Sequence, residues 1–154
     1  MTHDELVRKA AAWLRRGAIV PDWRGPRIRN VRCSVVLTEC AGGGGEIPDA
    51  IGFAFGARWS VLIECKTSRS DFLADAKKWH RRPCMKRFHG LGMYRYFLAP
   101  AGLLKFDEMP RGWGLLEVHG RSVQVVRVAL QREPDHAAEK NVLWSALREA
   151  QAAT

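Results

Sequence analysis

The sequence predicts a single α/β domain in which a central β-sheet is flanked by helices. Helical spacing of apolar residues marks the two ends of the chain, a capping pattern marks one inner helix, and β-rich apolar runs lie between them. The chain has 154 residues, of which 47% are hydrophobic. This is enough for one hydrophobic core and too little for two. We therefore expect one domain over residues 1–154.

The first element is a predicted helix over Asp4–Arg16, which Gly17 ends. Its apolar residues recur at helical spacing: Leu6, Val7, Ala10, Trp13 and Leu14. The following segment, Pro21–Arg32, is expected to be a loop.

Three strands are predicted next, at Cys33–Cys40, Ile47–Phe55 and Trp59–Lys66. A run of glycines over 42–45 joins the first two strands. The middle of the third strand, residues 61–63, is apolar throughout, which is typical of a strand buried on both faces.

A second helix is expected from about Arg69 to His80. Ser68, with Asp71 three residues later, resembles a capping box in which Asp replaces Glu. A fourth strand is predicted at Met93–Leu98, because this run is apolar and aromatic.

The last elements are a hairpin and a helix. The hairpin comprises Trp113–Val118 and Arg121–Ala129, which turn at His119 and Gly120. The helix, His136–Ala152, is expected to pack on the sheet through one apolar face. That face carries Val142, Leu143, Ala146, Leu147 and Ala150.

The second and third strands form a predicted hairpin around Gly56-Ala57, and Gly at the first position is typical of a two-residue type II′ turn. This turn sets the register of the two arms. It places Asp49 opposite Glu64, with Cβ atoms about 5 Å apart on one face. Lys66 lies two residues beyond Glu64 and points to the same face.

Two facing carboxylates repel each other, and a charge on a buried strand is costly without a partner. A divalent cation such as Mg²⁺ removes both problems, because it takes oxygen ligands from one or two carboxylates, waters and a phosphate. Asp49 and Glu64 suit this role, and the backbone carbonyl of Cys65 is a further candidate ligand. Lys66 would then be a positive charge beside a phosphate or a nucleophilic water. The alternative is structural, with Glu64 and Lys66 forming an ion pair at a strand end.

These residues also carry a resemblance to a known family. Pro48-Asp49, followed by Glu64-Cys65-Lys66 and a helix, is similar to the PD-(D/E)XK nuclease superfamily. The stretch 63–79, IECKTSRSDFLADAKKW, and the later strand YRYFLAP resemble its MmcB-like DNA repair branch and related bacteriophage-encoded nucleases. The resemblance covers about residues 33–128, and the longer stretch is more specific than the short motif.

The resemblance implies a restriction-endonuclease-like core with a central mixed β-sheet flanked by helices. It implies Mg²⁺-dependent hydrolysis, with Mn²⁺ as a substitute, Asp49 and Glu64 as metal ligands and Lys66 as the catalytic lysine. Many members add an upstream glutamate, for which Glu39 is the candidate and Glu46 the competitor. Pro48-Asp49-Ala50-Ile51 stands where the repair branch has Arg-Ala-Asp-Val, and the glycine run is unusual. These departures leave the subfamily and the structure of the substrate open.

Charge independently favours a nucleic-acid partner. The net charge is +9 with a pI near 10.0, and basic side chains bind polyanions by releasing phosphate counterions. Residues 76–106 contain no acid, and their cations are Lys77, Lys78, Arg81, Arg82, Lys86, Arg87, Arg95 and Lys105. A second acid-free stretch, 23–32, holds Arg24, Arg27, Arg29 and Arg32.

We expect phosphate contacts from the first acid-free stretch and from the start of the second helix. The expected nucleic-acid-binding residues are Ser68, Arg69, Lys77, Lys78, Arg81, Arg82, Lys86 and Arg87. The structural alternatives are a helix cap for Ser68 and cations that complement a helix dipole.

Other classes of protein are disfavoured. The four cysteines, Cys33, Cys40, Cys65 and Cys84, lack zinc-ligand spacing and suit small buried residues in a reducing compartment. No signal peptide or membrane-spanning run is visible, so we expect a cytoplasmic protein without a membrane partner.

The expected function is metal-dependent hydrolysis of DNA phosphodiester bonds, in DNA repair, recombination or phage DNA processing. Endonuclease and exonuclease action both remain open. One alternative is a non-catalytic basic DNA-binding module with the same fold, and another is a structural subunit whose acidic pair binds a metal only to hold the hairpin. Many superfamily members dimerise, so a homodimer is admissible. Because we expect one domain, any selection of particular DNA sites would come from the structure of the DNA or from a protein partner.

Overall fold

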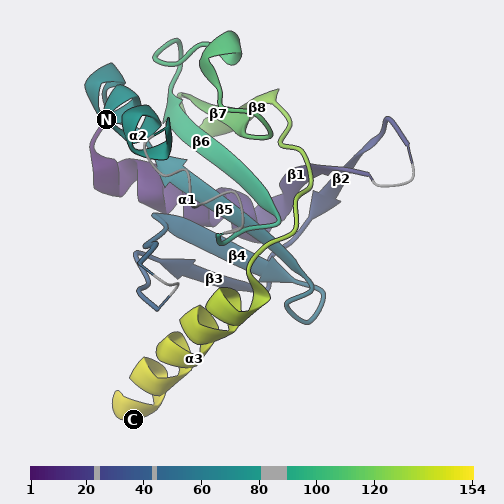
Figure 1. Cartoon of the computed structure of the whole chain (residues 1–154), viewed down its shortest axis with the longest axis vertical. Helices are drawn as coiled ribbons and strands as arrows, with labels where there is room; N and C mark the ends of the chain where they lie inside the picture. Colours follow the sequence, from purple (N-terminus) through teal and green to yellow (C-terminus); the bar gives the residue numbers. More distant parts are fainter. Residues whose placement is uncertain (23–24, 43–44, 81–89) are drawn as a thin grey trace.

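The structure is a computed structural model that describes residues 1–22, 25–42, 45–80 and 90–154, with the backbone alone over 76–80. A mixed six-stranded sheet lies at its centre and helices cover it (Figure 1). A second, two-stranded sheet lies beside it. The predicted α/β fold with a central sheet flanked by helices is therefore confirmed.

Among the described elements, five strands lie between the first two helices, and three more strands lie between the second helix and the last. The helices are α1 (His3–Gly17), α2 (Arg69–His80), α3 (His136–Ala152) and a 3-10 turn, η2 (Phe106–Glu108). The strands are β1 (Ala18–Pro21), β2 (Ile28–Val31), β3 (Val35–Thr38), β4 (Ala50–Ala54), β5 (Trp59–Cys65), β6 (Tyr94–Pro100), β7 (Gly114–His119) and β8 (Ser122–Arg127).

The large sheet has the order β3-β4-β5-β6-β7-β8. β3, β4 and β5 form an antiparallel meander, and β5, β6 and β7 run parallel. β8 returns antiparallel to β7. The segment that joins parallel strands β5 and β6 contains α2, because such a connection needs a crossover. The start of β4 and the end of β5 therefore lie near the start of α2.

Each face of the sheet has its own hydrophobic core. On one face α1 packs through Leu6, Ala10 and Leu14 against alternate residues of the strands, including Val61 and Ile63 of β5. The other face carries Leu62, with residues of α2 and the first turns of α3 over the same side. Residues 61–63 are fully buried, which confirms the expectation that β5 is covered on both faces.

The register of the β4–β5 hairpin is the predicted one. Ile51 pairs with Leu62, and Phe53 pairs with Ser60. The turn type differs, because Phe55, Gly56 and Ala57 have positive φ, of 53°, 64° and 63°. Positive φ at both central residues of the turn, Gly56 and Ala57, is the signature of type I′, so the predicted type II′ turn is wrong. Both turns have two central residues, which is why the register is unaffected.

Several predicted boundaries also change. β3 and β4 are shorter than predicted at both ends, and β6 begins one residue later and extends to Pro100. The loop expected over Pro21–Arg32 is wrong, because β1 pairs antiparallel with β2 over Ile28–Val31. Val20 and Val31 are buried in the core on the α1 side, which holds this ribbon at the body while it projects sideways (Figure 1).

Helix α3 has the predicted bounds, but only its first half packs on the body. Val142 is fully buried, and a Cβ on Gly42 would meet Ser145 Oγ at 2.8 Å. Trp144 and Leu147 are 62% and 54% exposed, and the helix extends away from the sheet (Figure 1). The prediction that its whole apolar face packs on the sheet is therefore wrong for the second half.

Candidate active site at the end of the β4–β5 hairpin

Asp49, Glu64 and Lys66 converge at the end of the hairpin opposite its turn. Asp49 immediately precedes β4, Glu64 is the penultimate residue of β5, and Lys66 follows β5. The ladder ends with Ala50 paired to Ile63, so Asp49 stands one step further on, opposite Glu64. Alternation along the strand puts Glu64 and Lys66 on the Leu62 side, the side of α2.

The carboxylate of Asp49 is held from two directions. Its Oδ2 accepts a 2.6 Å hydrogen bond from the backbone N–H of Cys65, and its Oδ1 lies 3.3 Å from Nε2 of His3. The backbone carbonyl of Asp49 accepts from the N–H of Glu39 at 3.2 Å. These contacts tie the start of β4 to β3, β5 and α1, so the Asp49 side chain has a defined position.

Glu64 is the carboxyl group of the site whose pKa is raised. Burial, and then the negative charge of Asp49, raise the pKa of Glu64 to about 8, although the nearby charge of Lys66 acts in the opposite direction. A carboxyl group with so high a pKa is one that lacks sufficient positive charge. Perturbed carboxyls of this kind occur at functional sites more often than elsewhere.

Lys66 is only 8% exposed, and its ammonium group forms an ion pair with the carboxylate of Asp75. Asp75 comes from the second turn of α2, so this helix positions the lysine beside the two acids. The backbone N–H of Lys66 also donates to the carbonyl of Leu98 at 2.9 Å, which fixes the end of β5 against β6. The side chain is therefore held above the end of the sheet.

Sequence reasoning missed His3 and Asp75. Thr2 and Glu5 form a capping box that starts α1 at His3, and this pattern is readable in the sequence. Nothing in the pattern, however, places His3 at Asp49. Asp75 lies one helical turn beyond Asp71, but only the packing of α2 on the sheet brings it to Lys66.

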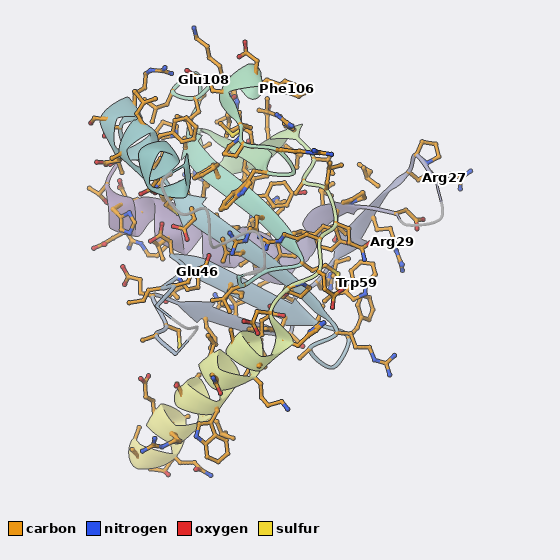
Figure 2. The ribbon with its side chains drawn as sticks, in the orientation of Figure 1. Arg27, Arg29, Glu46, Trp59, Phe106 and Glu108 are labelled. Atoms are coloured by element: carbon orange, nitrogen blue, oxygen red, sulfur yellow. The ribbon has the colours of Figure 1, made fainter. Side chains whose placement is uncertain are left out.

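The two candidate accessory glutamates differ in how they are engaged. Glu46 (Figure 2) binds Arg95 through Oε1 at 2.7 Å and accepts from the N–H of Leu91 through Oε2 at 2.9 Å. Glu39 is exposed, and its Oε1 lies 3.7 Å from His3. Because both oxygens of Glu46 already have donors, Glu39 has the greater remaining capacity to bind a ligand.

A divalent cation fits the chemistry of the site, although the ligand set is small. Within the described residues, no group of three or more His, Cys, Asp or Glu side chains is arranged to hold a metal ion. The donors at hand are the facing carboxylates of Asp49 and Glu64 and the main chain at Cys65. Such a set resembles Mg²⁺ sites that complete their coordination with water and substrate phosphate.

The start of α2 lies next to this site. Ser68 Oγ accepts from the N–H of Asp71 at 3.2 Å, as the predicted cap requires. The guanidinium of Arg69 forms two hydrogen bonds with Glu108, one of 3.0 Å, and a third of 3.2 Å with the carbonyl of Leu103. Arg69 must therefore exchange Glu108 for any phosphate that it contacts. Glu108 lies at the α2 end of the molecule (Figure 2).

Most of the expected nucleic-acid-binding residues cannot be placed. Arg81, Arg82, Lys86 and Arg87 lie outside the described residues, as do the side chains of Lys77 and Lys78. In the second basic stretch, the Arg29 guanidinium lies 5.3 Å from the centre of the Trp59 ring, at the opposite end of β5 from Glu64 (Figure 2). This arginine therefore belongs to a surface remote from the facing carboxylates.

The cysteines that the structure describes are free thiols. Cys33 and Cys65 are buried on the α1 side of the sheet, and burial raises the pKa of Cys33 to about 11 and raises that of Cys65 also. The side chain of Cys65 thus points away from Glu64, as alternation along the strand predicts. Cys84 lies outside the described residues.

Among the helices of the described segments, none has the length and apolar character that a bilayer crossing requires.

Comparisons with known proteins bear on the fold. No family model matches the chain, and a search of curated proteins finds no match. A search of solved structures finds a protein of unknown function from Silicibacter pomeroyi, with a TM-score of 0.64 and 23% sequence identity. The alignment covers 99% of this chain and 91% of that chain. The similarity is therefore one of fold, over nearly the full length of both chains.

Proposed function

We propose that this protein is a metal-dependent nuclease that hydrolyses DNA phosphodiester bonds. The observation that supports the proposal most strongly is the facing pair Asp49 and Glu64, in which the pKa of Glu64 is raised to about 8, beside the buried Lys66. A cation between the two carboxylates would relieve their repulsion and return Glu64 to its ionised form.

Asp49 and Glu64 would hold Mg²⁺ or Mn²⁺, with the backbone carbonyl of Cys65 and the carboxylate of Glu39 as further ligands. When bound, the metal would polarise a phosphoryl oxygen and lower the pKa of a coordinated water. The hydrogen bond from Cys65 to Asp49 Oδ2 keeps that carboxylate facing the site. A carboxylate has about four acceptor positions, so the ones that Cys65 and His3 do not occupy would bind the metal.

Lys66 would stabilise the negative charge that develops on the phosphate in the transition state, or orient the attacking water. Its near-complete burial makes a fixed charge there more effective than one in water. Asp75 is a positioning residue in this scheme, because its ion pair holds the ammonium group of Lys66.

Basic groups around the site would bind the rest of the DNA. The start of α2 and the hydroxyl of Ser68 follow Lys66 closely in the chain, and a helix N-terminus favours phosphate. Arg69 would take part by exchanging Glu108. The net charge of +9 supports salt-sensitive binding. Within the cell we propose a cytoplasmic role in DNA repair, recombination or phage DNA processing, with a homodimer or a targeting protein as partner.

The test is cleavage of plasmid, linear duplex, single-stranded and branched DNA by purified protein, with Mg²⁺, with Mn²⁺ or with a chelator. Asp49→Asn keeps the shape of the side chain and removes its charge, and Asp107→Asn, at an exposed position, is the matched control. The proposal predicts metal-dependent products that Asp49→Asn lacks. Binding without products under every condition would refute the enzyme and favour a non-catalytic DNA-binding module.

A further inference from the structure

A pocket of about 380 Å³ opens at the start of β6 and β7. Its lining residues are Arg95, Arg111, Gly112, Trp113, Leu130, Gln131 and Arg132. Three of the seven are arginines, and none is acidic. Cavities of this size hold small molecules or single groups of larger ones. The lining therefore selects for an anion.

Arg95 is rigidly held at the base of this pocket. Its Nε donates to the carbonyl of Leu91 at 2.7 Å, and its guanidinium lies 5.1 Å from the centre of the Trp113 ring. The ion pair with Glu46 uses one terminal nitrogen. The guanidinium fork offers five N–H donors, so Arg95 keeps donors for a further acceptor without moving.

The other two arginines bring positive charge that the described residues do not neutralise at close range. Within the described part of the chain, no carboxylate comes within ion-pairing distance of Arg111 or Arg132. Burial and then the charge of Arg95 lower the pKa of Arg132 to about 10. Glu46 and the buried Glu139 act against this, but Glu46 is already paired with Arg95. Three carboxylates, Glu46, Glu64 and Glu139, thus act on these arginines from outside the lining of the pocket, and the first of them is paired with Arg95.

Arg95 connects the pocket to the candidate site, because it lies on the strand next to Glu64. Arg95 pairs with Leu62, and Glu64 is the next residue of β5 on the same face. From ordinary strand spacing and rise, the Cα atoms of Arg95 and Glu64 are about 8 Å apart. The two also interact electrostatically, since Glu64 raises the pKa of Arg95 against the lowering effect of burial. One nucleic-acid strand therefore has the reach to contact both places.

We propose that Arg95, Arg111 and Arg132 bind a phosphate group of the same nucleic-acid strand whose scissile phosphate lies at Glu64 and Lys66. This rests on the proposed nuclease function for its substrate and adds a site that positions it. Arg132 and Arg111 supply the charge, and Arg95 supplies a fixed donor geometry. The bound phosphate compensates the repulsion between Arg95 and Arg132.

The test measures binding separately from cleavage. Fluorescein-labelled single-stranded and duplex oligonucleotides are titrated in a chelator, so that no hydrolysis occurs, at several salt concentrations. The double variant Arg111→Gln/Arg132→Gln should bind about tenfold more weakly, and the slope of log K against log salt should become shallower by about 1. The matched control is Arg121→Gln/Arg148→Gln, which removes two exposed arginines elsewhere.

Equal losses of affinity in the double variant and its control would overturn the proposal, because general charge would then account for binding. A second result would also overturn it. If the double variant loses binding of inorganic phosphate but keeps the wild-type affinity for oligonucleotides, the occupant of the pocket is a free phosphorylated molecule. The single variant Arg111→Gln, at an exposed position, guards against misfolding and should show part of the loss. If the protein cleaves DNA but the double variant binds like the control, the nuclease function stands and the phosphate site is refuted. If the double variant binds more weakly but the wild type cleaves DNA in no metal, the phosphate site stands and the nuclease function is refuted.

Discussion

Asp49 and Glu64 stand opposite each other at the end of the β4–β5 hairpin, and the charge of Asp49 helps to raise the pKa of Glu64 to about 8. The arrangement is costly for a folded protein at neutral pH. The cost is offset if a divalent cation ordinarily occupies the site, because the cation balances the negative charges of both carboxylates and of a bound phosphate.

Stability should therefore fall as pH rises in the absence of divalent cations. The folded-state pKa of Glu64 is above its ordinary value of 4.5, so its stabilising contribution is complete below pH 4.5 and is lost as pH rises to about 8. Gln at this position stays neutral at every pH, so Glu64→Gln should show a smaller fall in Tm. Near pH 8 the loss of Tm should be about 5 °C less than in the wild type. Thermal melts across this range test it. Parallel pH curves for the two proteins would show that Glu64 has no raised pKa.

Mg²⁺ should oppose the same decline. A cation bound to Asp49 and Glu64 stabilises the folded state by mass action, so Tm of the wild type should rise with Mg²⁺ concentration at pH 8. In Glu64→Gln the rise should be largely lost. An equal rise in both proteins would mean that Mg²⁺ acts elsewhere.

Asp75→Asn should lower kcat about tenfold with little change in KM, because the ion pair holds Lys66 in place and does not reach the substrate. Asp75→Glu, which restores the charge, should recover part of the rate. Asp71→Asn, one turn earlier on α2, is the control. A rise in KM with unchanged kcat would instead indicate that Asp75 affects substrate binding.

Glu108→Gln should release Arg69 and strengthen DNA binding about threefold, the scale of a surface ion pair. Arg69 and the N–H of Lys105 hold the pKa of Glu108 down to about 2. The pair therefore persists at all working pH values and is lost only as pH falls from 4.5 towards 2. Fluorescence anisotropy with a labelled duplex measures the change. Weaker binding in Glu108→Gln would show that Arg69 serves only to anchor α2.

Ala57→Gly should stabilise the hairpin by up to about 1 kcal/mol, since Ala57 has a φ of 63°, which glycine adopts without steric cost. Chemical denaturation measures the gain. Ala12→Gly, in the interior of α1, is the control and should destabilise by about 1 kcal/mol. A loss of stability at position 57 would contradict the type I′ turn.

The sequence predicted the elements whose patterns are local and long. The hairpin register follows from a two-residue turn between two β-rich runs, and it held despite the wrong turn type. Helix α2 and helix α3 have the expected bounds because caps and periodicity mark them. The four-residue strands β1 and β2 were missed because strands so short carry little pattern and because β1 ends in Pro21, a residue that disfavours strands. Tertiary contacts stabilise them, including the hydroxyl of Tyr96 donating to the carbonyl of Ile19.

The candidate site was predictable only in part. Asp49, Glu64 and Lys66 share one hairpin, so strand alternation alone places them together. His3 and Asp75 come from α1 and α2 and reach the site through packing between distant segments. The exposed second half of α3 was also not predictable, because an apolar helical face does not show which surface it packs against.

The most direct test of the proposed function is the single-turnover rate of DNA cleavage by Lys66→Ala, compared with wild type and with Lys140→Ala, an exposed lysine on α3. Metal and DNA concentrations are held above saturation, so that binding does not limit the rate. The proposal predicts a fall of about 100-fold or more in Lys66→Ala, the scale of one lost electrostatic contact in a transition state, and an unchanged rate in Lys140→Ala. Wild-type rates in Lys66→Ala would contradict it.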